Sequence, residues 1–408
     1  MVTIMQGLQD YVWQIRRFQA NARWFLLGGF LIGVGFSIFS LLFNLTLREA
    51  GFTEDLIGRI LSLGSLGTFL AALPAAYLSK RFPAQTILVI SSLLGAFGYL
   101  AQASFLQPEL LMGANLFVGG VLTVSRLLSA PFFMRNSSSS ERAHLFAFNM
   151  AVGVLAGILG NLLGGYLPTF FQSFGFSHLT ALQVSLGTGA VLALTGLIPY
   201  GLIREKKAAG PPITVRQLFR AQDKRLIVKI CIPYALVGMG AGLVIPFLNL
   251  YFRDVFSASP GQIGVYFAFL QGMMVLGFLS GPVLARRLGM INTIVLSQLA
   301  SIPFMLILAL APSLPLALAA FLIRGTLMNM SGPIQSLFNM EMVPAADREV
   351  TNSFSALAWN GAWTISSWVG GSIIHTLSFS ISFYITIGFY VLSSFAYYFL
   401  FRRVEQRV

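Results

Sequence analysis

The chain has 408 residues, of which 56% are hydrophobic and only 10% charged, and its mean hydropathy is +0.79. A soluble domain carries about 25% charged residues, and a chain folded in water cannot hide this much apolar surface. These values exclude a soluble protein and make lipid the solvent. The single cysteine, Cys231, excludes an internal disulfide.

Apolar runs of about 20 residues, long enough to cross a bilayer as a helix, recur along the whole chain. We therefore predict an all-α polytopic membrane protein with twelve transmembrane helices. In chain order the runs lie near residues 24–47, 56–78, 86–106, 110–134, 144–171, 179–203, 229–251, 261–284, 291–311, 314–339, 351–375 and 379–401.

The net charge of +13 would suit a nucleic-acid partner, so the position of the charges matters. With the N-terminus inside, all but five of the 26 Lys and Arg fall on the cytoplasmic side. The exceptions are Arg48, Arg59 and Arg253 on the other side, and Arg126 and Arg324 within spans. This asymmetry is the positive-inside rule. It predicts a multi-pass protein of the cell inner membrane with both termini cytoplasmic, and no nucleic-acid partner.

The chain divides near its middle. We predict an N-terminal six-helix bundle (1–203), a cytoplasmic linker (204–228) and a C-terminal six-helix bundle (229–408). The linker is the only long charged stretch, and Gly210-Pro211-Pro212 breaks any helix in it. The residues after this break indicate a basic amphipathic helix on the inner leaflet, and residues 1–22 suggest a second interfacial helix. A solvated linker and a frayed helix extension explain the two segments equally well.

The two halves repeat each other in sequence. Residues 43–49 (FNLTLRE) align with residues 248–254 (LNLYFRD) at an offset of 205. An offset of 206 pairs Ile57-Gly58 with Ile263-Gly264, Lys80-Arg81 with Arg286-Arg287, Gly119 with Gly325, Glu141-Arg142 with Asp347-Arg348, and Gly164-Gly165 with Gly370-Gly371. Several matches at one offset indicate two pseudo-symmetric bundles of common design. Parallel repeats of this kind are an architecture of transporters whose halves rock about a midplane site.

Two stretches carry a family resemblance. The loop after the second predicted helix reads AYLSKRFPAQ (76–85), with PVLARRLG (282–289) as its repeat, and the fifth predicted helix contains GNLLGG (160–165). They resemble the motifs G-x-x-x-D-R-x-G-R-R and G-P-x-x-G-G of the major facilitator superfamily. Lys80 and Arg286 replace the family's aspartate, and Asn161 replaces its proline. The resemblance covers essentially the whole chain. It implies secondary transport by alternating access through a cavity lined by the first, fourth, seventh and tenth helices.

Polar and aromatic residues recur at helical spacing on the helices that this resemblance places around the cavity, and on the eleventh helix. Small residues on the same helices are more often packing residues, because they let helices approach closely. The candidate substrate-binding residues are Asn115, Arg126, Tyr234, Asn249, Arg324, Gln335, Trp359, Asn360 and Trp363.

The two arginines within spans, Arg126 and Arg324, are the strongest of these candidates. A charge at bilayer depth costs a few kcal/mol, and it usually faces a cavity or a partner; the alternative is an arginine that binds the carbonyls of a neighbouring helix. No Asp or Glu lies in the middle third of any predicted span. The resulting electropositive cavity favours an anionic substrate group, and the many Phe and Trp suit an apolar body on that substrate.

We therefore predict a monomeric secondary transporter for a small organic solute, with an amphiphilic organic anion as the favoured substrate class. A multidrug or lipid-type exporter with a mostly apolar pocket is the first alternative, supported by the glycine motif of the fifth helix. A non-transporting sensor on the same fold is the second. The sequence contains no recognisable catalytic set, metal-ligand cluster or nucleotide loop, so we expect no enzyme activity, cofactor or metal.

A gate is predicted at the cytoplasmic ends of the second and eighth helices. The four cations there, Lys80, Arg81, Arg286 and Arg287, cannot approach one another without acidic partners. The repeat offers Glu141, Asp347 and Glu349 at the start of the fifth and eleventh helices. We expect Glu141 to pair with the second pair of cations and Asp347 or Glu349 with the first, in the outward-open state. The alternative for Glu141 is a capping box with Ser138.

Overall fold

The computed structural model describes residues 18–205, 223–310, 312–344 and 347–405, and all its regular elements are helices. Most of the two predicted interfacial segments, 1–22 and 204–228, lies outside these residues. In the first half the helices are α2 (Ala20–Glu49), α3 (Glu54–Arg81), α4 (Ala84–Ser104), α5 (Pro108–Arg135), α6 (Ser139–Gln172), α7 (His178–Thr195) and α8 (Leu197–Gly201).

The second half repeats this order with more interruptions. Its helices are α10 (Lys224–Val244), the 3-10 turn η1 (Ile245–Phe247), α11 (Leu248–Phe256), α12 (Pro260–Leu288), α13 (Met290–Leu310), α14 (Leu314–Met330), α15 (Gly332–Met342), α16 (Arg348–Thr376) and α17 (Phe379–Glu405).

The seventh and tenth predicted spans are broken in the structure, where the sequence predicts continuous helices. α10 ends before Pro246, and α14 ends at Met330, two residues before Gly332-Pro333 starts α15. A proline lacks the N–H that a continuing helix needs, and its ring clashes with the preceding turn. Pro246 and Pro333 instead occupy the first turn of the next element, where the missing N–H is tolerated.

Eleven helical segments of the described chain are long and apolar enough to cross a membrane. α16, with 29 residues, supplies the twelfth helix of spanning length and is not among those eleven segments. The prediction of an all-α polytopic membrane protein with twelve spanning helices is thereby confirmed.

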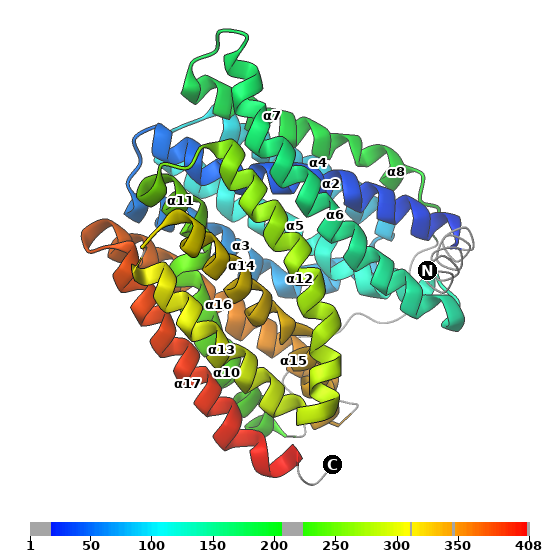
Figure 1. The fold of residues 1–408 in the computed structure, drawn as a ribbon. Coiled ribbons are helices and arrows are strands. Elements are labelled where there is room, and N and C mark those ends of the chain that lie inside the picture. Colours follow the sequence, from blue (N-terminus) through cyan, green and yellow to red (C-terminus); the bar gives the residue numbers. More distant parts are fainter. Residues whose placement is uncertain (1–17, 206–222, 311, 345–346, 406–408) are drawn as a thin grey trace, which may run out of the picture.

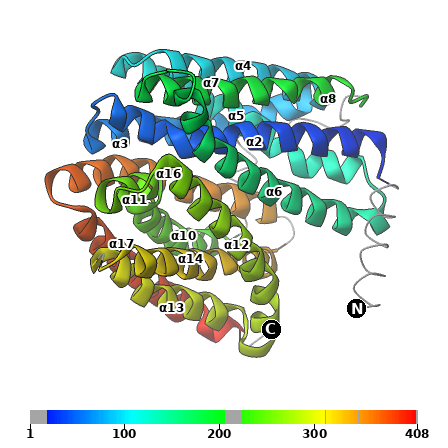
Figure 2. The same ribbon diagram turned by 45° about the horizontal axis from the view of Figure 1, so that its top comes forward.

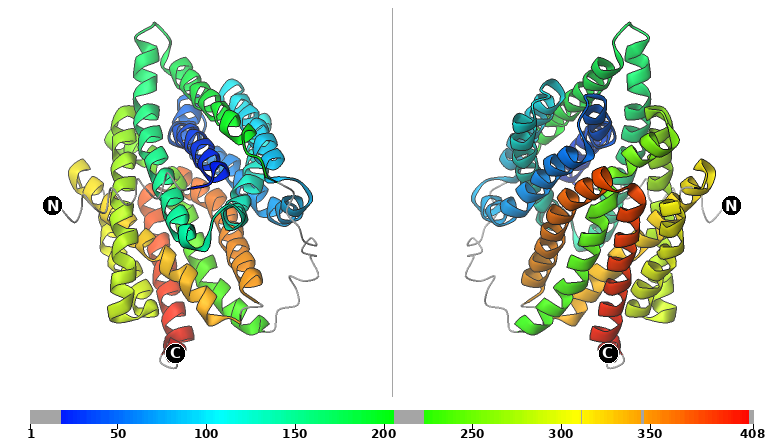
Figure 3. Two further views of the ribbon diagram at one scale, coloured as in Figure 1. Left: turned by 90° about the vertical axis from the view of Figure 1, so that its right-hand side faces the viewer. Right: turned by 90° about the vertical axis from the view of Figure 1, so that its left-hand side faces the viewer.

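The helices form two bundles. α2 packs on α6 and α7, and α3 on α5, whereas α10 packs on α16 and α17, and α13 on α14 and α17. The bundles meet where α3 lies against α16 and where α6 lies against α12 (Figure 2 and Figure 3). They converge at the end that carries α11 and the start of α3 (Figure 1), whereas the first turn of α2 and the last turn of α17 lie far from it. We call these the closed end and the terminal end.

The repeat seen in the sequence has a matching geometry. Arg142 donates from a terminal guanidinium nitrogen to the carbonyl of Met134 at 3.3 Å, and Arg348 donates from Nε to the carbonyl of Met340 at 2.8 Å. Both arginines and both methionines are related by the offset of 206. Each hydrogen bond joins the start of one helix to the end of the preceding one. The two halves therefore use one connection at equivalent corners.

Candidate functional site

A cavity of about 800 Å³ lies in the wall of the second bundle, open toward α6 of the first. It extends from Leu248, next to the closed end, to Gln335 and Ser336 on α15. Its lining comprises Met150, Tyr234, Val237, Ala241, Ile245, Leu248, Phe267, Leu270, Met274, Phe278, Arg324, Gly325, Met328, Asn329, Gly332, Pro333, Gln335, Ser336, Trp359, Trp363 and Tyr390. Most of these side chains are apolar, so the cavity suits a largely apolar molecule.

Arg324 supplies the charge of this cavity. The residue is only 5% exposed, and it donates from a terminal nitrogen to the hydroxyl of Tyr390 at 2.6 Å. Its Nε is buried and has no hydrogen-bond partner among the described residues. The described lining contains no Asp or Glu. A buried guanidinium with an unused donor and no acid beside it offers a site for an anionic group, since arginine binds carboxylates through paired N–H donors.

Aromatic and amide side chains form the wall around the arginine. Trp359 and Trp363 on α16 stack with their ring centroids 5.8 Å apart. Tyr234 on α10 accepts a hydrogen bond from Asn339 at 3.0 Å, and Gln335 donates to the hydroxyl of Ser331 at 2.9 Å. The flat faces of the two indoles give the cavity a surface on which a ring or chain can pack.

Five of the nine predicted substrate-binding residues thus line one cavity: Tyr234, Arg324, Gln335, Trp359 and Trp363. The glycines of α10 explain how α16 comes so close. A Cβ added at Gly238 would lie 2.9 Å from the carbonyl oxygen of Trp359, and one at Gly242 would lie 2.0 Å from the hydroxyl of Ser366. These glycines therefore serve packing, the role that is usual for small residues in membrane helices.

The other four candidates lie elsewhere. Asn115 donates to Gln102 at 3.3 Å and packs beside Gly64, between α3, α4 and α5. Asn249 is buried at the contact between α2 and α11. Asn360 donates to the carbonyl of Ala356 in its own helix at 2.8 Å. Asn115, Asn249 and Asn360 are thus not among the residues that line this cavity, and a role of each in substrate binding stays a prediction.

Arg126 is exposed and is not among the cavity-lining residues. Its guanidinium carbon lies 5.2 Å from the ring centroid of Phe36 on α2, within the range of a cation–π contact. The two arginines that the sequence treats alike therefore differ, because only Arg324 is buried in the cavity wall. A role of Arg126 in substrate binding stays a prediction.

Tyr390 is the residue that the sequence analysis missed. It lies on α17, outside the helices that the family resemblance places around the cavity, yet it is fully buried and holds Arg324. The available signal was the polar hydroxyl inside an apolar run, residues 385–392. A buried tyrosine needs a partner for its hydroxyl, and that requirement could have pointed to a buried arginine.

The described residues of the predicted cytoplasmic gate have contacts or exposure that differ from the expected cross-bundle pairs. Glu141 forms the capping box with Ser138 at the start of α6, and Arg81 bonds the hydroxyl of Tyr77 at 3.0 Å. Asp347 is 2% exposed and accepts from the backbone N–H of Asp223 at 3.2 Å. Arg286 and Arg287 are exposed on the last turn of α12.

The side chains of Lys80 and Glu349 lie outside the described part of the structure. The expected cross-bundle pairs belong to the opposite conformation, and they stay a prediction.

A model of the Major Facilitator Superfamily matches residues 25–360 and 230–408. Among solved structures, the nucleoside transporter NupG has a TM-score of 0.75 at 17% identity, over 94% of this chain and 98% of that chain. A bacterial homolog of the human lysosomal transporter Spinster, in an inward-facing and occupied conformation, has a TM-score of 0.75 at 14% identity, over 93% and 96%.

A D-xylose–proton symporter has a TM-score of 0.72 at 17% identity, over 95% of this chain and 97% of that chain. No curated protein sequence matches the chain. At such identities the solved structures establish the fold, and the substrate has to be argued from the cavity.

Proposed function

The chain belongs to the Major Facilitator Superfamily, and we propose that it is a secondary transporter that moves an amphiphilic organic anion by alternating access. The observation that carries this proposal is the buried guanidinium of Arg324 in a mainly apolar cavity whose described lining has no acid. An unpaired charge in such a place is costly. A substrate that brings its own negative charge removes that cost while it is bound.

The apolar remainder of the cavity selects the body of the substrate. Its Phe, Met and Trp side chains contact an apolar group and offer few polar partners. Methionines adapt their shape to different apolar surfaces, and the Trp359–Trp363 stack suits a planar ring. A carboxylate on an aromatic or branched aliphatic body matches both parts of the cavity.

Flux in proteoliposomes tests this proposal with paired compounds. Each pair consists of an aromatic carboxylate and its neutral primary amide, which keeps the shape and removes the charge. We expect saturable transport of the carboxylate and at least about tenfold weaker transport of the amide, because a charge-assisted hydrogen bond contributes about 1.5–3 kcal/mol. Equal transport of both members would contradict an anion site.

A multidrug exporter is the second candidate, because most of the cavity lining is apolar and contains three methionines, Met150, Met274 and Met328. Lipophilic cations separate the two functions, since Arg324 repels them. Saturable flux of the cations in place of the carboxylates would support the exporter. Ligand-dependent thermal stabilisation without any flux would support the non-transporting sensor.

We further propose that the terminal end faces the cytoplasm of the inner membrane, as the positive-inside asymmetry predicts. Single cysteines in a Cys231→Ser background test this orientation in intact cells. We expect Ser173→Cys, which follows α6 at the closed end, to react with an impermeant thiol reagent. Gly210→Cys in the linker should react only after the membrane is permeabilised. The reverse pattern would invert the proposed topology.

A further inference from the structure

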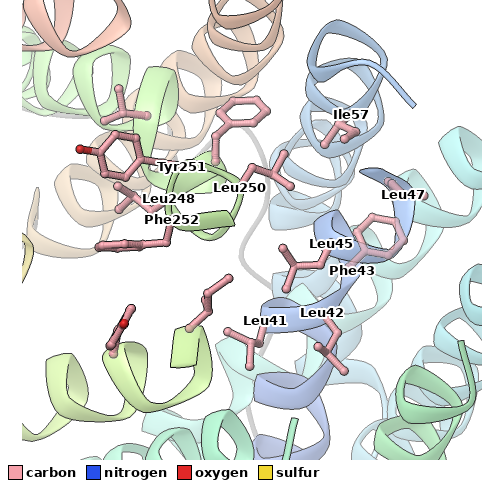
Figure 4. Close-up of a cluster of buried hydrophobic side chains, with 14 of the residues drawn as sticks. Leu41, Leu42, Phe43, Leu45, Leu47, Ile57, Leu248, Leu250, Tyr251 and Phe252 are labelled. Carbon is pink, nitrogen blue, oxygen red and sulfur yellow. The ribbon is translucent and has the colours of Figure 1, made fainter. Parts of the chain in front are cut away.

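The repeated motif Asn-x-x-x-Arg-acid brings its two copies together at the closed end. One copy, Asn44–Glu49, lies on the last turns of α2, and the other, Asn249–Asp254, lies on α11. The two copies are related by the offset of 205. Both segments contribute to one apolar cluster, in which Leu45 and Leu250 lie on the facing sides of the two helices (Figure 4).

The two asparagines make reciprocal hydrogen bonds across this contact. Asn44 donates from Nδ2 to the carbonyl of Pro246 at 2.6 Å, and Asn249 donates from Nδ2 to the carbonyl of Leu41 at 2.9 Å. The acceptors Leu41 and Pro246 are themselves 205 residues apart, so the two bonds are equivalent under the repeat. Each asparagine is only 4% exposed. Buried amides held by backbone carbonyls allow one register of the two helices and resist sliding.

The arginines and acids at the ends of the two motifs also pair reciprocally, each copy with the other. Arg253 pairs with Glu49 at 2.7 Å, and Arg48 pairs with Asp254 at 3.5 Å. Each arginine therefore binds the acid that belongs to the other copy of the motif. Both arginine side chains are about 30% exposed, so these pairs are partly screened by solvent.

Two close helix crossings at glycines also join the two bundles at the closed end. A Cβ added at Gly58 of α3 would lie 3.0 Å from the Cα of Gly371 on α16, and one added at Gly264 of α12 would lie 2.9 Å from the Cα of Gly165 on α6. The two crossings are related by the offset of 206. Backbones this close leave no room for side chains, so the bundles touch directly here.

We propose that the two copies of the motif form a latch with two equivalent halves, which keeps the closed end shut and has to release both halves together before the cavity can open there. The latch rests on the alternating access proposed above. The amide and charged side chains of the latch form hydrogen bonds with water when the closed end opens. The closed state is therefore only moderately more stable than the open state, as reversible switching requires. Because each asparagine binds the other bundle, loss of either one removes half of the latch.

Distances between spin labels at the closed end test the latch without any substrate. The labels are placed at Ser173→Cys, after α6, and Ser313→Cys, before α14, in a Cys231→Ser background. We expect Asn44→Ala and Asn249→Ala to raise the ratio of open to closed populations by similar factors, each on the order of tenfold, because each leaves a buried carbonyl without its donor. Glu49→Gln is expected to raise it by about two- to fivefold.

Arg59→Gln is the matched control. Arg59 pairs at 2.8 Å with Asp55 in its own helix at the same end. Its loss removes an ion pair within one bundle and leaves in place the hydrogen bond that Asp55 accepts from Ser372 of α16. We expect no change in the distance distribution. The exchange Glu49→Arg with Arg253→Glu is expected to restore the closed population that either single change reduces.

The latch is overturned if the asparagine variants leave the distribution unchanged, or if only one of them shifts it. Should either asparagine variant fail to fold, the charge exchange decides alone, and absence of restoration rejects the latch. Failure of the proposed function looks different. A protein whose labels respond as expected while no carboxylate is transported keeps its latch and loses its substrate assignment.

Discussion

The closed end and the cavity differ in how they use the internal repeat. At the closed end, reciprocal asparagine bonds, exchanged ion pairs and glycine crossings follow the repeat residue by residue. In the cavity the repeat has diverged. Arg324 has Val118 as its equivalent at the offset of 206, and Trp359 and Trp363 have Gly153 and Gly157.

The difference indicates that closing one end of the protein uses the symmetry of the two bundles, whereas binding the substrate does not. Closing one end requires two bundles to meet face to face, so a motif that complements its own copy serves both sides at once. An organic substrate has one charged group and one body, so one arginine and one aromatic wall are sufficient. The first bundle uses Val118 for internal packing against Gly98 of α4. Of the glycines equivalent to the tryptophans, Gly157 lies against Gln271 of α12 in the other bundle, and nothing in the described structure lies within 4 Å of a Cβ added at Gly153.

The largest expected effect concerns the cavity, where the repeat has diverged. Arg324→Ala should lower the apparent affinity for the anion by about 10- to 100-fold, because it removes the charged partner of the substrate. Arg324→Lys should restore little, since an ammonium lacks the planar fork. Flux measured against substrate concentration checks both.

Arg402→Ala is the control for Arg324. Arg402 also donates to a tyrosine hydroxyl, that of Tyr398 at 2.9 Å, but this pair is exposed near the end of α17. A loss of affinity in the control equal to that in Arg324→Ala would remove the special role of the cavity arginine.

The next largest effect is expected at the closed end, where the glycine crossings follow the repeat. In Gly264→Ala the added Cβ would lie 2.4 Å from the carbonyl oxygen of Asn161. Overpacking of this kind costs about 1–3 kcal/mol, so we expect a lower thermal unfolding temperature and a larger open fraction in the spin-label measurement. Gly272→Ala is the control in the same helix, because nothing lies within 4 Å of its added Cβ. Equal behaviour of the two variants would contradict a tight crossing.

A smaller effect tests whether the two stacked tryptophans of the cavity wall contact the body of the substrate. Trp363→Leu removes one ring of the indole stack and keeps an apolar side chain. We expect the affinity for carboxylates with an aromatic body to fall about two- to tenfold, as an aromatic pair contributes about 0.5–1.5 kcal/mol. Carboxylates with an aliphatic body should be affected less. A uniform loss over both series would indicate a general packing role.

The smallest expected effect concerns the predicted gate at the terminal end. An exposed pair of Glu141 with Arg287 in the opposite conformation would contribute about 0–1 kcal/mol. A double-mutant cycle of Glu141→Gln and Arg287→Gln measures this coupling in the spin-label equilibrium. If the effects simply add, Glu141 serves only as the cap seen in the structure. Asp347 is unsuitable for charge reversal because it is buried.

Much of the fold could be predicted from composition and periodicity. The helix breaks in the seventh and tenth spans could not, although Pro246 and Pro333 were visible, because many membrane helices tolerate proline. Among the site residues, Arg324 was predicted from the cost of a charge at bilayer depth. Tyr390 was missed, because its importance depends on a partner 66 residues away.

The sequence by itself determined the solvent, the number of spans, the twofold repeat and the family resemblance, since these follow from local hydropathy and from matches at one offset. Only the tertiary structure decided what the repeated residues do. Asn249 appeared as a cavity residue in the sequence, and it is a buried link between bundles in the structure. Helical spacing defines the face of a residue on its own helix. Whether that face meets a cavity, a neighbouring helix or the other bundle depends on helix packing, which short sequence patterns do not encode.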